Sequence, residues 1–260
     1  MRVEPDRVAG NLADVQTRMN AARERSGRPR TPVRLVAVTK TVDPQTVILL
    51  TSLGVADFGE NRVQELTRKA ALLQDLLARK KGSGAFCAEH PSGPTGKRLL
   101  TPFSVEGIRW HMIGRLQRNK VKHLLAYSRT LHSLDSVPLA EAVSRRAADA
   151  GLDVTVLIEV NVSGEATKGG VAPGEAALLA EAVVKLPAVK LRGLMTMAPF
   201  TDDPEKVRPV FAGLRELAAT LARNLPDGAM SELSMGMSQD FEVAIEEGAT
   251  MVRIGSALFV

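Results

Sequence analysis

The stretch that decides the fold is Val-Arg-Leu-Val-Ala-Val-Thr-Lys, residues 33–40. Its first six residues are mostly apolar and rich in β-branched side chains, a pattern typical of a short strand that is buried on both faces. Such strands belong to parallel sheets whose two faces are covered. Lys40 therefore stands at the carboxyl end of a strand, which is the edge where α/β proteins place the residues that bind ligands.

A helix follows this strand, and the strand-helix unit recurs along the chain. Asp43 and Pro44 predict an N-cap and a first-turn proline, and Gly54 predicts a left-handed C-cap. Further strands are predicted near 56–58, 110–113, 131–134, 154–160, 189–195, 233 and 251–254, and helices near 62–78, 118–126, 138–150, 174–186, from 203 onward and 239–247. Eight strands that alternate with helices predict parallel pairing and a single closed α/β barrel, the (β/α)₈ or TIM barrel. Pro209 predicts a kink or a late start in the helix that follows residue 203.

Two segments stand outside the repeated unit. Apolar residues at helical spacing predict an extra N-terminal helix over residues 6–25. Residues 80–107 are polar and rich in glycine and proline, so they are predicted to form a long, flexible loop insertion in one domain that spans 1–260. Cys87 and His90 lie in this insertion without further ligands nearby, and no metal site is predicted.

The composition is that of an ordinary globular protein. Of the 260 residues, 45% are hydrophobic and 24% are charged, and no apolar run approaches the roughly 18 residues of a membrane helix. The formal net charge of +5 would attract phosphates, but aromatic residues make up only 3% and no nucleic-acid-binding motif is present. No nucleic acid and no membrane are therefore expected as partners. A single cysteine and a start without an apolar signal segment favour the cytoplasm.

Lys40 and two glycine-serine segments suggest a phosphate ligand that bears a carbonyl group. A lysine amine can condense with an aldehyde to form a Schiff base. Residues 234–238 follow the seventh strand, and Gly255 and Ser256 follow the eighth, the two places where barrels often bind phosphate. Either segment alone is better explained as a turn, so their joint placement is the stronger evidence.

Three other side chains are candidates for the mouth of the barrel. Arg253 lies between Val252 and Ile254 in the last strand, so its side chain points opposite to theirs and can enter the barrel, where it can face a pyridine nitrogen. An ion pair with Glu159 is the alternative. Asn61 follows the second strand and can contact a ring substituent, although a helix cap would look the same. His111 lies in the third strand, where a lone histidine is more often a satisfied core residue.

Several ordered motifs carry a resemblance to a known family. They include Thr-Lys at 39–40, Phe-Gly-Glu-Asn at 58–61, Trp-His-Met-Ile-Gly at 110–114, Leu-Gln-Arg-Asn-Lys at 116–120, Glu-Val-Asn at 159–161, Gly-Leu-Met at 193–195, Leu-Ser-Met-Gly-Met-Ser at 233–238 and Val-Arg-Ile-Gly at 252–255. In these motifs the chain resembles the pyridoxal phosphate homeostasis proteins, which are also called alanine racemase N-terminal-domain-like or proline synthase co-transcribed proteins. The likeness covers the whole chain apart from residues 80–107.

The resemblance implies a barrel of the alanine racemase N-terminal type that binds pyridoxal 5'-phosphate (PLP). It implies a Schiff base on Lys40, Arg253 facing the pyridine nitrogen, and a phosphate held by Ser234, Gly255 and Ser256. It also implies a role in intracellular PLP and vitamin B6 homeostasis without established catalytic activity, and apo PLP-dependent enzymes as possible recipients of the cofactor. A monomer is expected from the closed barrel.

Other functions remain open at this point. A weak amino-acid racemase or a Schiff-base enzyme acting on a phosphorylated substrate would use the same lysine. Racemases of this fold take one acid-base group from a second, β-rich domain, and no such domain follows here. Tyr127 is the only tyrosine and is predicted at the end of a helix, away from the site, while Met235 to Ser238 can screen one face of the ligand. A third hypothesis makes the basic loop at 80–107 a docking segment for a partner enzyme.

The chain also leaves room for little or no eighth helix after the last strand, which leaves open how that strand is covered.

Overall fold

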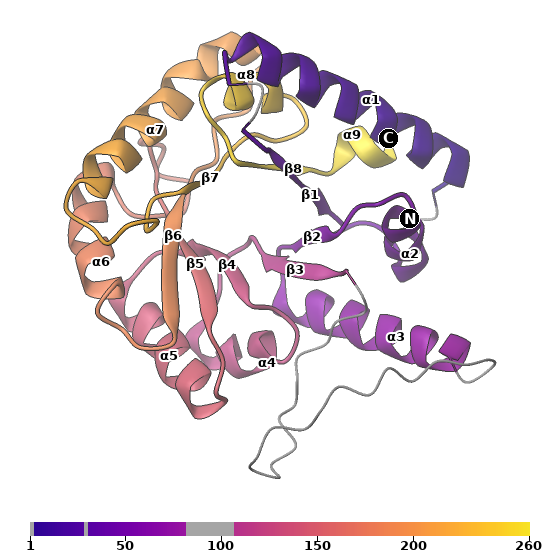
Figure 1. Ribbon diagram of the computed structural model, residues 1–260, viewed down its shortest axis with the longest axis horizontal. Coiled ribbons are helices and arrows are strands. Elements are labelled where there is room, and N and C mark those ends of the chain that lie inside the picture. Colours follow the sequence, from indigo (N-terminus) through magenta and orange to yellow (C-terminus); the bar gives the residue numbers. More distant parts are fainter. Residues whose placement is uncertain (1–2, 29–30, 82–106) are drawn as a thin grey trace.

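The computed structural model describes residues 3–28, 31–81 and 107–260, which form a closed parallel barrel with an outer ring of helices (Figure 1). The strands pair in chain order, and the last strand pairs with the first. Their bounds are Arg34–Val38 (β1), Asp57–Glu60 (β2), Arg109–Met112 (β3), Thr130–Leu134 (β4), Val154–Glu159 (β5), Val189–Met195 (β6), Glu232–Ser234 (β7) and Met251–Ile254 (β8). The prediction of a (β/α)₈ barrel is confirmed.

The helices follow the strands as predicted, with short 3₁₀ turns before three of them. The α-helices are Pro5–Arg25 (α1), Pro44–Ser52 (α2), Val63–Lys81 (α3), Val121–Leu125 (α4), Val137–Asp149 (α5), Ala176–Val183 (α6), Arg208–Ala222 (α7), Phe241–Glu246 (α8) and Ser256–Phe259 (α9). The 3₁₀ turns are Arg118–Lys120 (η1), Pro173–Glu175 (η2) and Pro204–Val207 (η3).

Local sequence explains where the helices begin and end. The Asp43 side chain accepts a hydrogen bond of 2.9 Å from the backbone N–H of Thr46, and Gly54 adopts a left-handed φ of +89° after α2. Pro209 lies in the first turn of α7, where its missing N–H is harmless, and η3 precedes it. The predicted late start of this helix is confirmed.

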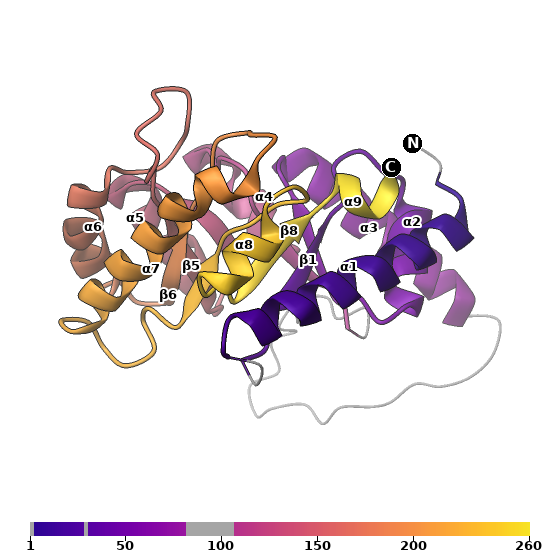
Figure 2. The same ribbon diagram turned by 90° about the horizontal axis from the view of Figure 1, so that it is seen from above.

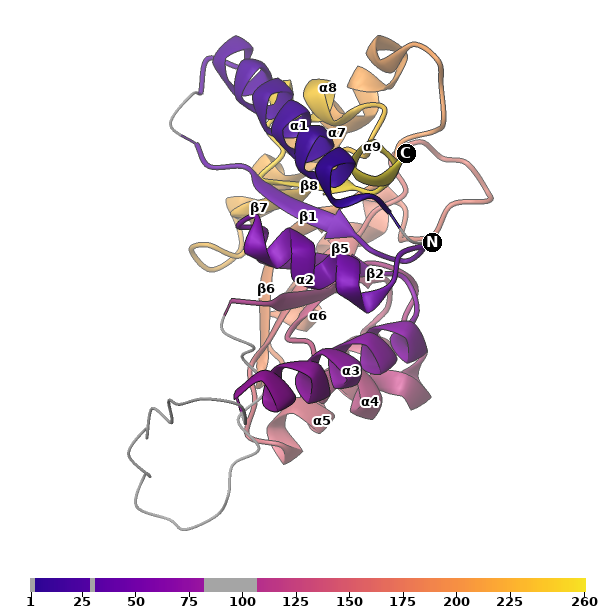
Figure 3. The same ribbon diagram turned by 90° about the vertical axis from the view of Figure 1, so that its right-hand side faces the viewer.

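Helix α1 covers the outside of β8 and β1, beside the short helix α9. Helix α9 has only four residues, and α1 packs against α8, α9 and α2 on the outside of β8 and β1 (Figure 2 and Figure 3). The amide of Asn11 donates a hydrogen bond of 3.2 Å to the carbonyl of Leu258, and the Arg18 guanidinium lies 4.7 Å from the ring centre of Phe241. The N-terminal helix therefore takes over the covering role of an eighth helix.

The predicted insertion lies largely outside the described residues. Helix α3 runs on through Lys81, so the predicted boundary at residue 80 was wrong, because the helix continues beyond its last apolar residues. Residues 82–106, which include Cys87 and His90, are not described. A search of the described helices finds no candidate membrane span, and the described residues contain no group of three or more histidine, cysteine or acidic side chains placed to hold a metal ion.

The inside of the barrel contains an apolar layer that is separate from the main core. Val36, Leu157, Met195 and Met251 form this layer and are fully buried. Because side chains alternate along a strand, residues two positions further along each strand also point inward, closer to the mouth. Val38 and Met197 follow as apolar side chains, whereas Glu159 and Arg253 follow as buried polar ones and belong to the site described next.

Candidate functional site

Lys40 lies at the mouth of the barrel, directly after β1. Its side chain is exposed, while Thr39 beside it is fully buried. Strand β1 pairs with β8 so that Ala37 lies opposite Ile254. A Cβ atom built on Gly255 would lie 3.4 Å from the Cβ of Val38. Lys40 and the start of α9 therefore occupy neighbouring strand ends, as the sequence predicted.

A buried cluster fixes the strand end that carries Lys40. The Nζ atom of Lys69, on α3, donates a hydrogen bond of 2.6 Å to Oε1 of Glu60 and another to the carbonyl of Thr39. The Thr39 hydroxyl donates to the same Glu60 oxygen at 2.8 Å. Lys69 is 1% exposed and Glu60 is fully buried. We call Thr39, Glu60 and Lys69 the outer cluster, because it lies between the barrel and α3.

Sequence reasoning missed Lys69, although a signal was present. The lysine lies three residues after Leu66 and four before Leu73, which are both buried on the inner face of α3. A lysine at helical spacing within an apolar stripe points into the core and needs a buried partner. Glu60 is that partner.

Backbone groups after β7 and β8 converge on one point. Gly236 has a φ of +93°, and a Cβ atom there would lie 2.6 Å from the Cβ of Ala244, so this turn requires glycine. The hydroxyl oxygen of Ser238 accepts hydrogen bonds of 3.2 Å from the backbone N–H groups of Gly255 and Ala257. Two N–H groups at the start of α9 are thus aimed at a single oxygen atom. We call this arrangement of residues 236–238 and 255–257 the cradle.

Ser234 and Met235 lie elsewhere than expected. The Ser234 hydroxyl points into the barrel, where it is hydrogen-bonded to His132 Nδ1 at 2.8 Å and to Arg253 Nη1 at 2.7 Å. The side chain of Met235 is fully buried in the main core. The structure therefore brings Gly255 and Ser256 together with Ser238, and it does not bring the Ser234 and Met235 side chains to the cradle. The reason is strand alternation: Ser234 is an inward position of β7, and Met235 faces the helices.

Arg253 is buried inside the barrel below the mouth, as its position between Val252 and Ile254 predicted. It is 4% exposed, and besides its bond to Ser234 its Nη2 donates to the carbonyl of Thr196 at 2.9 Å. Burial lowers the pKa of Arg253 to about 10, against the opposing effect of Asp240 and Glu159, so the group stays positively charged at neutral pH. Its hydrogen bonds among the described residues go to Ser234 and Thr196, and the alternative ion pair with Glu159 is not formed.

Two buried carboxyl groups border the mouth. Burial, followed by the nearby charge of Asp135, raises the pKa of Glu159. Burial likewise raises the pKa of Asp240, although its Oδ1 accepts a hydrogen bond of 2.6 Å from the backbone N–H of Met237. Both groups therefore hold a proton more readily than exposed carboxyls do. The Asp240 bond also fixes the turn that forms the cradle.

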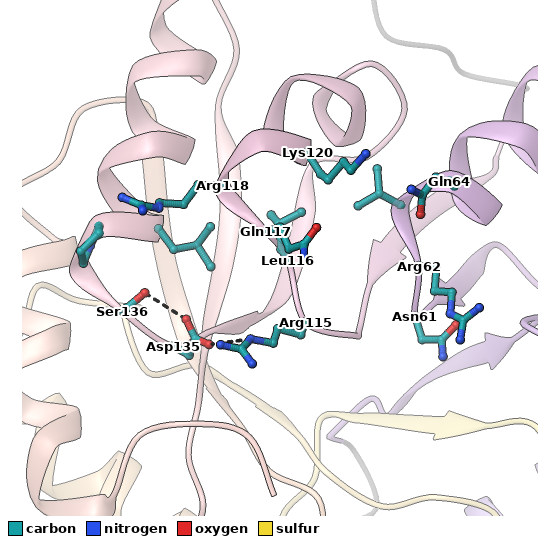
Figure 4. A pocket seen from close by; sticks show the side chains of 13 residues that line it. Asn61, Arg62, Gln64, Arg115, Leu116, Gln117, Arg118, Lys120, Asp135 and Ser136 are labelled. Carbon is teal, nitrogen blue, oxygen red and sulfur yellow. Dashed lines mark hydrogen bonds and ion pairs between the residues drawn. The ribbon is translucent and has the colours of Figure 1, made fainter.

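A basic cavity of about 810 Å³ adjoins the mouth at the ends of β2, β3 and β4 (Figure 4). The exposed side chain of Asn61 lines one edge, and Arg115, paired with Asp135 at 3.9 Å, lies across from it. Arg62, Arg118 and Lys120 add positive charge. Lys40 and the cradle do not line this cavity, so Asn61 is the predicted site residue that faces it.

The barrel has an exposed lysine after β1, a glycine-containing cradle after β7 and β8, and a buried arginine on β8. These features place it among α/β barrels that bind a ligand at the carboxyl ends of their strands. A family model described as "Alanine racemase, N-terminal domain" matches residues 10–260. A pyridoxal phosphate homeostasis protein of Aquifex aeolicus is 43% identical over 248 residues, which cover 95% of either chain. The protein of the same name from Pseudomonas aeruginosa is 39% identical and covers 97% of this chain and 94% of its own. The chain therefore belongs to the pyridoxal phosphate homeostasis protein family.

A solved structure agrees with this assignment. PipY of Synechococcus elongatus, in a structure described as having PLP bound, is 28% identical and superposes with a TM-score of 0.75. The match covers 97% of this chain and 100% of PipY. The family resemblance noted in the sequence motifs is confirmed.

Proposed function

We propose that this protein binds PLP at the mouth of the barrel, joined to Lys40 through a Schiff base, and takes part in PLP homeostasis. PLP supplies an aldehyde that condenses reversibly with an amine. The observation that carries the proposal is the position of Lys40: an exposed amine one strand away from the cradle, on a strand end held by the outer cluster. The relatives that are called pyridoxal phosphate homeostasis proteins, and the PipY structure with PLP bound, support it.

The residues around Lys40 fit the cofactor. The N–H groups of Gly255 and Ala257 already converge on an oxygen atom in Ser238, so the same groups can donate to a phosphate oxygen. We assign the phosphate to the backbone of the cradle, including Gly255 and Ser256, in place of the Ser234 hydroxyl. Asn61 borders the other side of the mouth and can contact a ring substituent.

Arg253 suits a pyridine nitrogen that stays unprotonated. The guanidinium is held by two hydrogen bonds and keeps its charge at neutral pH, and it can only donate. A donor at that nitrogen disfavours its protonation, which weakens the ring as an electron sink. This arrangement favours holding the cofactor over activating an amino-acid substrate.

We propose further that the protein holds and releases PLP without turnover. Tyr127, the only tyrosine of the chain, is half-buried against the main core after α4, so it is not a base at the mouth. Glu159 is the one observation that favours the alternative, a weak racemase, because its buried carboxyl borders the mouth with a raised pKa. Chiral analysis after incubation with L-alanine and PLP separates the two: sustained formation of D-alanine contradicts a pure carrier.

The test of binding is an absorption titration with PLP, with Lys40→Ala beside Lys120→Ala. Lys120 is the matched control, since it is a second lysine near the mouth and lines the basic cavity. We expect the wild type and Lys120→Ala to develop the visible band of a Schiff base, and Lys40→Ala to lack it. An unchanged band in Lys40→Ala contradicts the assignment.

Delivery to other enzymes and the monomeric state also remain proposals. Mixing the loaded protein with an apo PLP-dependent enzyme, and comparing its reactivation with that by free PLP at the same concentration, tests delivery. Reactivation no faster than with free PLP argues for storage alone.

Light scattering at several protein concentrations tests whether the protein is a monomer.

A further inference from the structure

A continuous row of buried polar side chains crosses the inside of the barrel and ends at Arg253. Asp57 Oδ1 lies 2.8 Å from His111 Nε2, and His111 Nδ1 lies 2.9 Å from His132 Nε2. His132 Nδ1 then lies 2.8 Å from the hydroxyl of Ser234, which accepts from Arg253 at 2.7 Å. Asp57 comes from β2, the histidines from β3 and β4, Ser234 from β7 and Arg253 from β8. We call these five residues the inner relay.

The row is sealed from solvent. Exposure is 3% for Asp57, 1% for His111, and none for His132 and Ser234. The two imidazole rings pack edge to face, with centroids 5.1 Å apart. Both nitrogens of each ring have a partner, so His111 is a satisfied core residue, as expected, and also part of a larger network. A fully satisfied buried network is rigid, and each member fixes its neighbours.

One end of the relay has a fixed ionisation state. Burial alone would raise the pKa of Asp57, but hydrogen bonds from His111 and Arg109 outweigh it and lower the pKa to about 2. The Arg109 guanidinium binds both carboxylate oxygens, at 2.8 and 2.6 Å. Asp57 is therefore a carboxylate at neutral pH, it can only accept, and His111 Nε2 must carry a proton.

At the other end, Arg253 and Ser234 determine which partner donates in each of the remaining hydrogen bonds. The single proton between the rings sits either on His132 Nε2 or on His111 Nδ1. In the first case the Ser234 hydroxyl donates to His132 Nδ1 and accepts from Arg253, and each polar hydrogen of the two rings and of the hydroxyl has a partner. In the second case His111 is a cation, His132 donates to Ser234, and the hydrogen of the Ser234 hydroxyl has no acceptor among the described residues. Buried polar groups are rarely left unpaired, so the first arrangement is favoured.

We propose that the inner relay runs in one direction, from Arg253 to Asp57, and that His111 and His132 are positioning residues that hold Arg253 in place behind the bound ligand. Both histidines are neutral, with the proton on Nε2. The Ser234 hydroxyl donates its hydrogen to His132 and accepts a hydrogen bond from Arg253. This gives Ser234 a positioning role in place of the phosphate contact expected from the sequence. Only the identity of the ligand that Arg253 faces rests on the proposed function.

The first experiment measures the tautomers directly in the protein without PLP. The chain has four histidines, and a long-range ¹H–¹⁵N correlation spectrum at pH 7 separates the two neutral tautomers from the cation. His132→Gln and His123→Gln assign the signals, and exposed His123 serves as the internal reference. We expect Nε2–H tautomers for His111 and His132. A proton on His132 Nδ1, or a doubly protonated His111, overturns the proposal whether or not PLP binds.

The second experiment tests the effect on Arg253 with two substitutions at one position. Glutamine at position 132 keeps one donor and one acceptor, and leucine keeps neither. We expect His132→Leu to weaken PLP binding about tenfold, because the Ser234 hydroxyl loses the acceptor that fixes the orientation in which it accepts from Arg253, and His132→Gln to stay within about threefold of the wild type. Equal affinities for the two variants overturn the positioning role. If the wild type itself does not bind PLP, the proposed function fails while the tautomer result still decides the relay.

Discussion

The outer cluster and the inner relay both depend on a carboxylate of β2 that a cation contacts directly, yet they connect that carboxylate to different parts of the molecule. Asp57 and Glu60 lie three residues apart, so they point to opposite faces of the strand. In the outer cluster Lys69 contacts Glu60 directly at 2.6 Å. In the inner relay two imidazole rings and a hydroxyl separate Asp57 from Arg253. Arg109 neutralises Asp57 as locally as Lys69 neutralises Glu60. The outer cluster then stabilises one strand end, whereas the inner relay spans the barrel and orients a group that can meet a ligand.

The largest effect is expected in the outer cluster. Lys69→Met keeps the length of the side chain and leaves the buried carboxylate of Glu60 without its cation. We expect the free energy of unfolding to fall by about 3–5 kcal/mol, as measured by urea denaturation.

Two further variants control this measurement. Lys122→Met changes an exposed lysine and should leave the free energy of unfolding within about 0.5 kcal/mol. The double variant Lys69→Met/Glu60→Gln removes both charges and should recover at least half of the loss. A single variant as stable as the wild type would mean that the direct ion pair does not hold this strand end.

A smaller effect on the free energy of unfolding, dependent on pH, is expected at Asp57, where the inner relay ends. The pKa of Asp57 is lowered in the folded protein to about 2, from an ordinary value of 3.8. A lowered pKa gives stability that is fully present above about pH 4 and is lost as the pH falls toward 2, and the shift corresponds to about 2 kcal/mol. Asp57→Asn should therefore lower the free energy of unfolding at pH 7 by about that amount.

The measurement is the urea midpoint of the wild type and Asp57→Asn between pH 2 and pH 7. The two curves should approach each other as the pH falls from 4 to 2, since the wild-type carboxylate is then protonated as well. A gap of constant size over that range would mean that the ionised form of Asp57 adds nothing to stability.

The smallest effect is expected where a charge pair is exposed. Arg115 and Asp135 lie 3.9 Å apart beside the basic cavity, and the Arg115 side chain is 87% exposed. Arg115→Ala should change the free energy of unfolding by less than about 0.5 kcal/mol. Urea denaturation checks it. A loss above about 1 kcal/mol would place this pair with the buried ones and weaken the contrast between buried and exposed charge.

The sequence predicted the repeated strand-helix unit because hydrophobic period and capping residues are local signals. Lys40, Gly255 and the inward direction of Arg253 followed from the same logic, since strand ends and alternation are visible in one chain. The direction of Ser234 did not follow, because β7 has only three residues and offers no alternation to count. His132 was missed for a related reason: its role depends on His111 and Ser234, which come from other strands and meet only once the barrel closes.

The covering of β8 also required the three-dimensional structure. The short α9 was visible in the sequence, but the apolar stripe of α1 carries no sign of which elements it contacts. Packing of α1 against α8, α9 and α2 is a long-range result of barrel closure. Local pattern thus predicted the elements and several site residues, while the contacts across the barrel determined what those residues do.

The most direct test of the account is peptide mapping of the wild-type protein after incubation with PLP and reduction by borohydride. Reduction converts a Schiff base into a stable bond, so mass spectrometry of the digest identifies the lysine that carried PLP. We expect the modification on Lys40, at near-stoichiometric PLP, with Lys69 unmodified because it is buried. A modification spread over exposed lysines such as Lys122, with none preferred at Lys40, would contradict it.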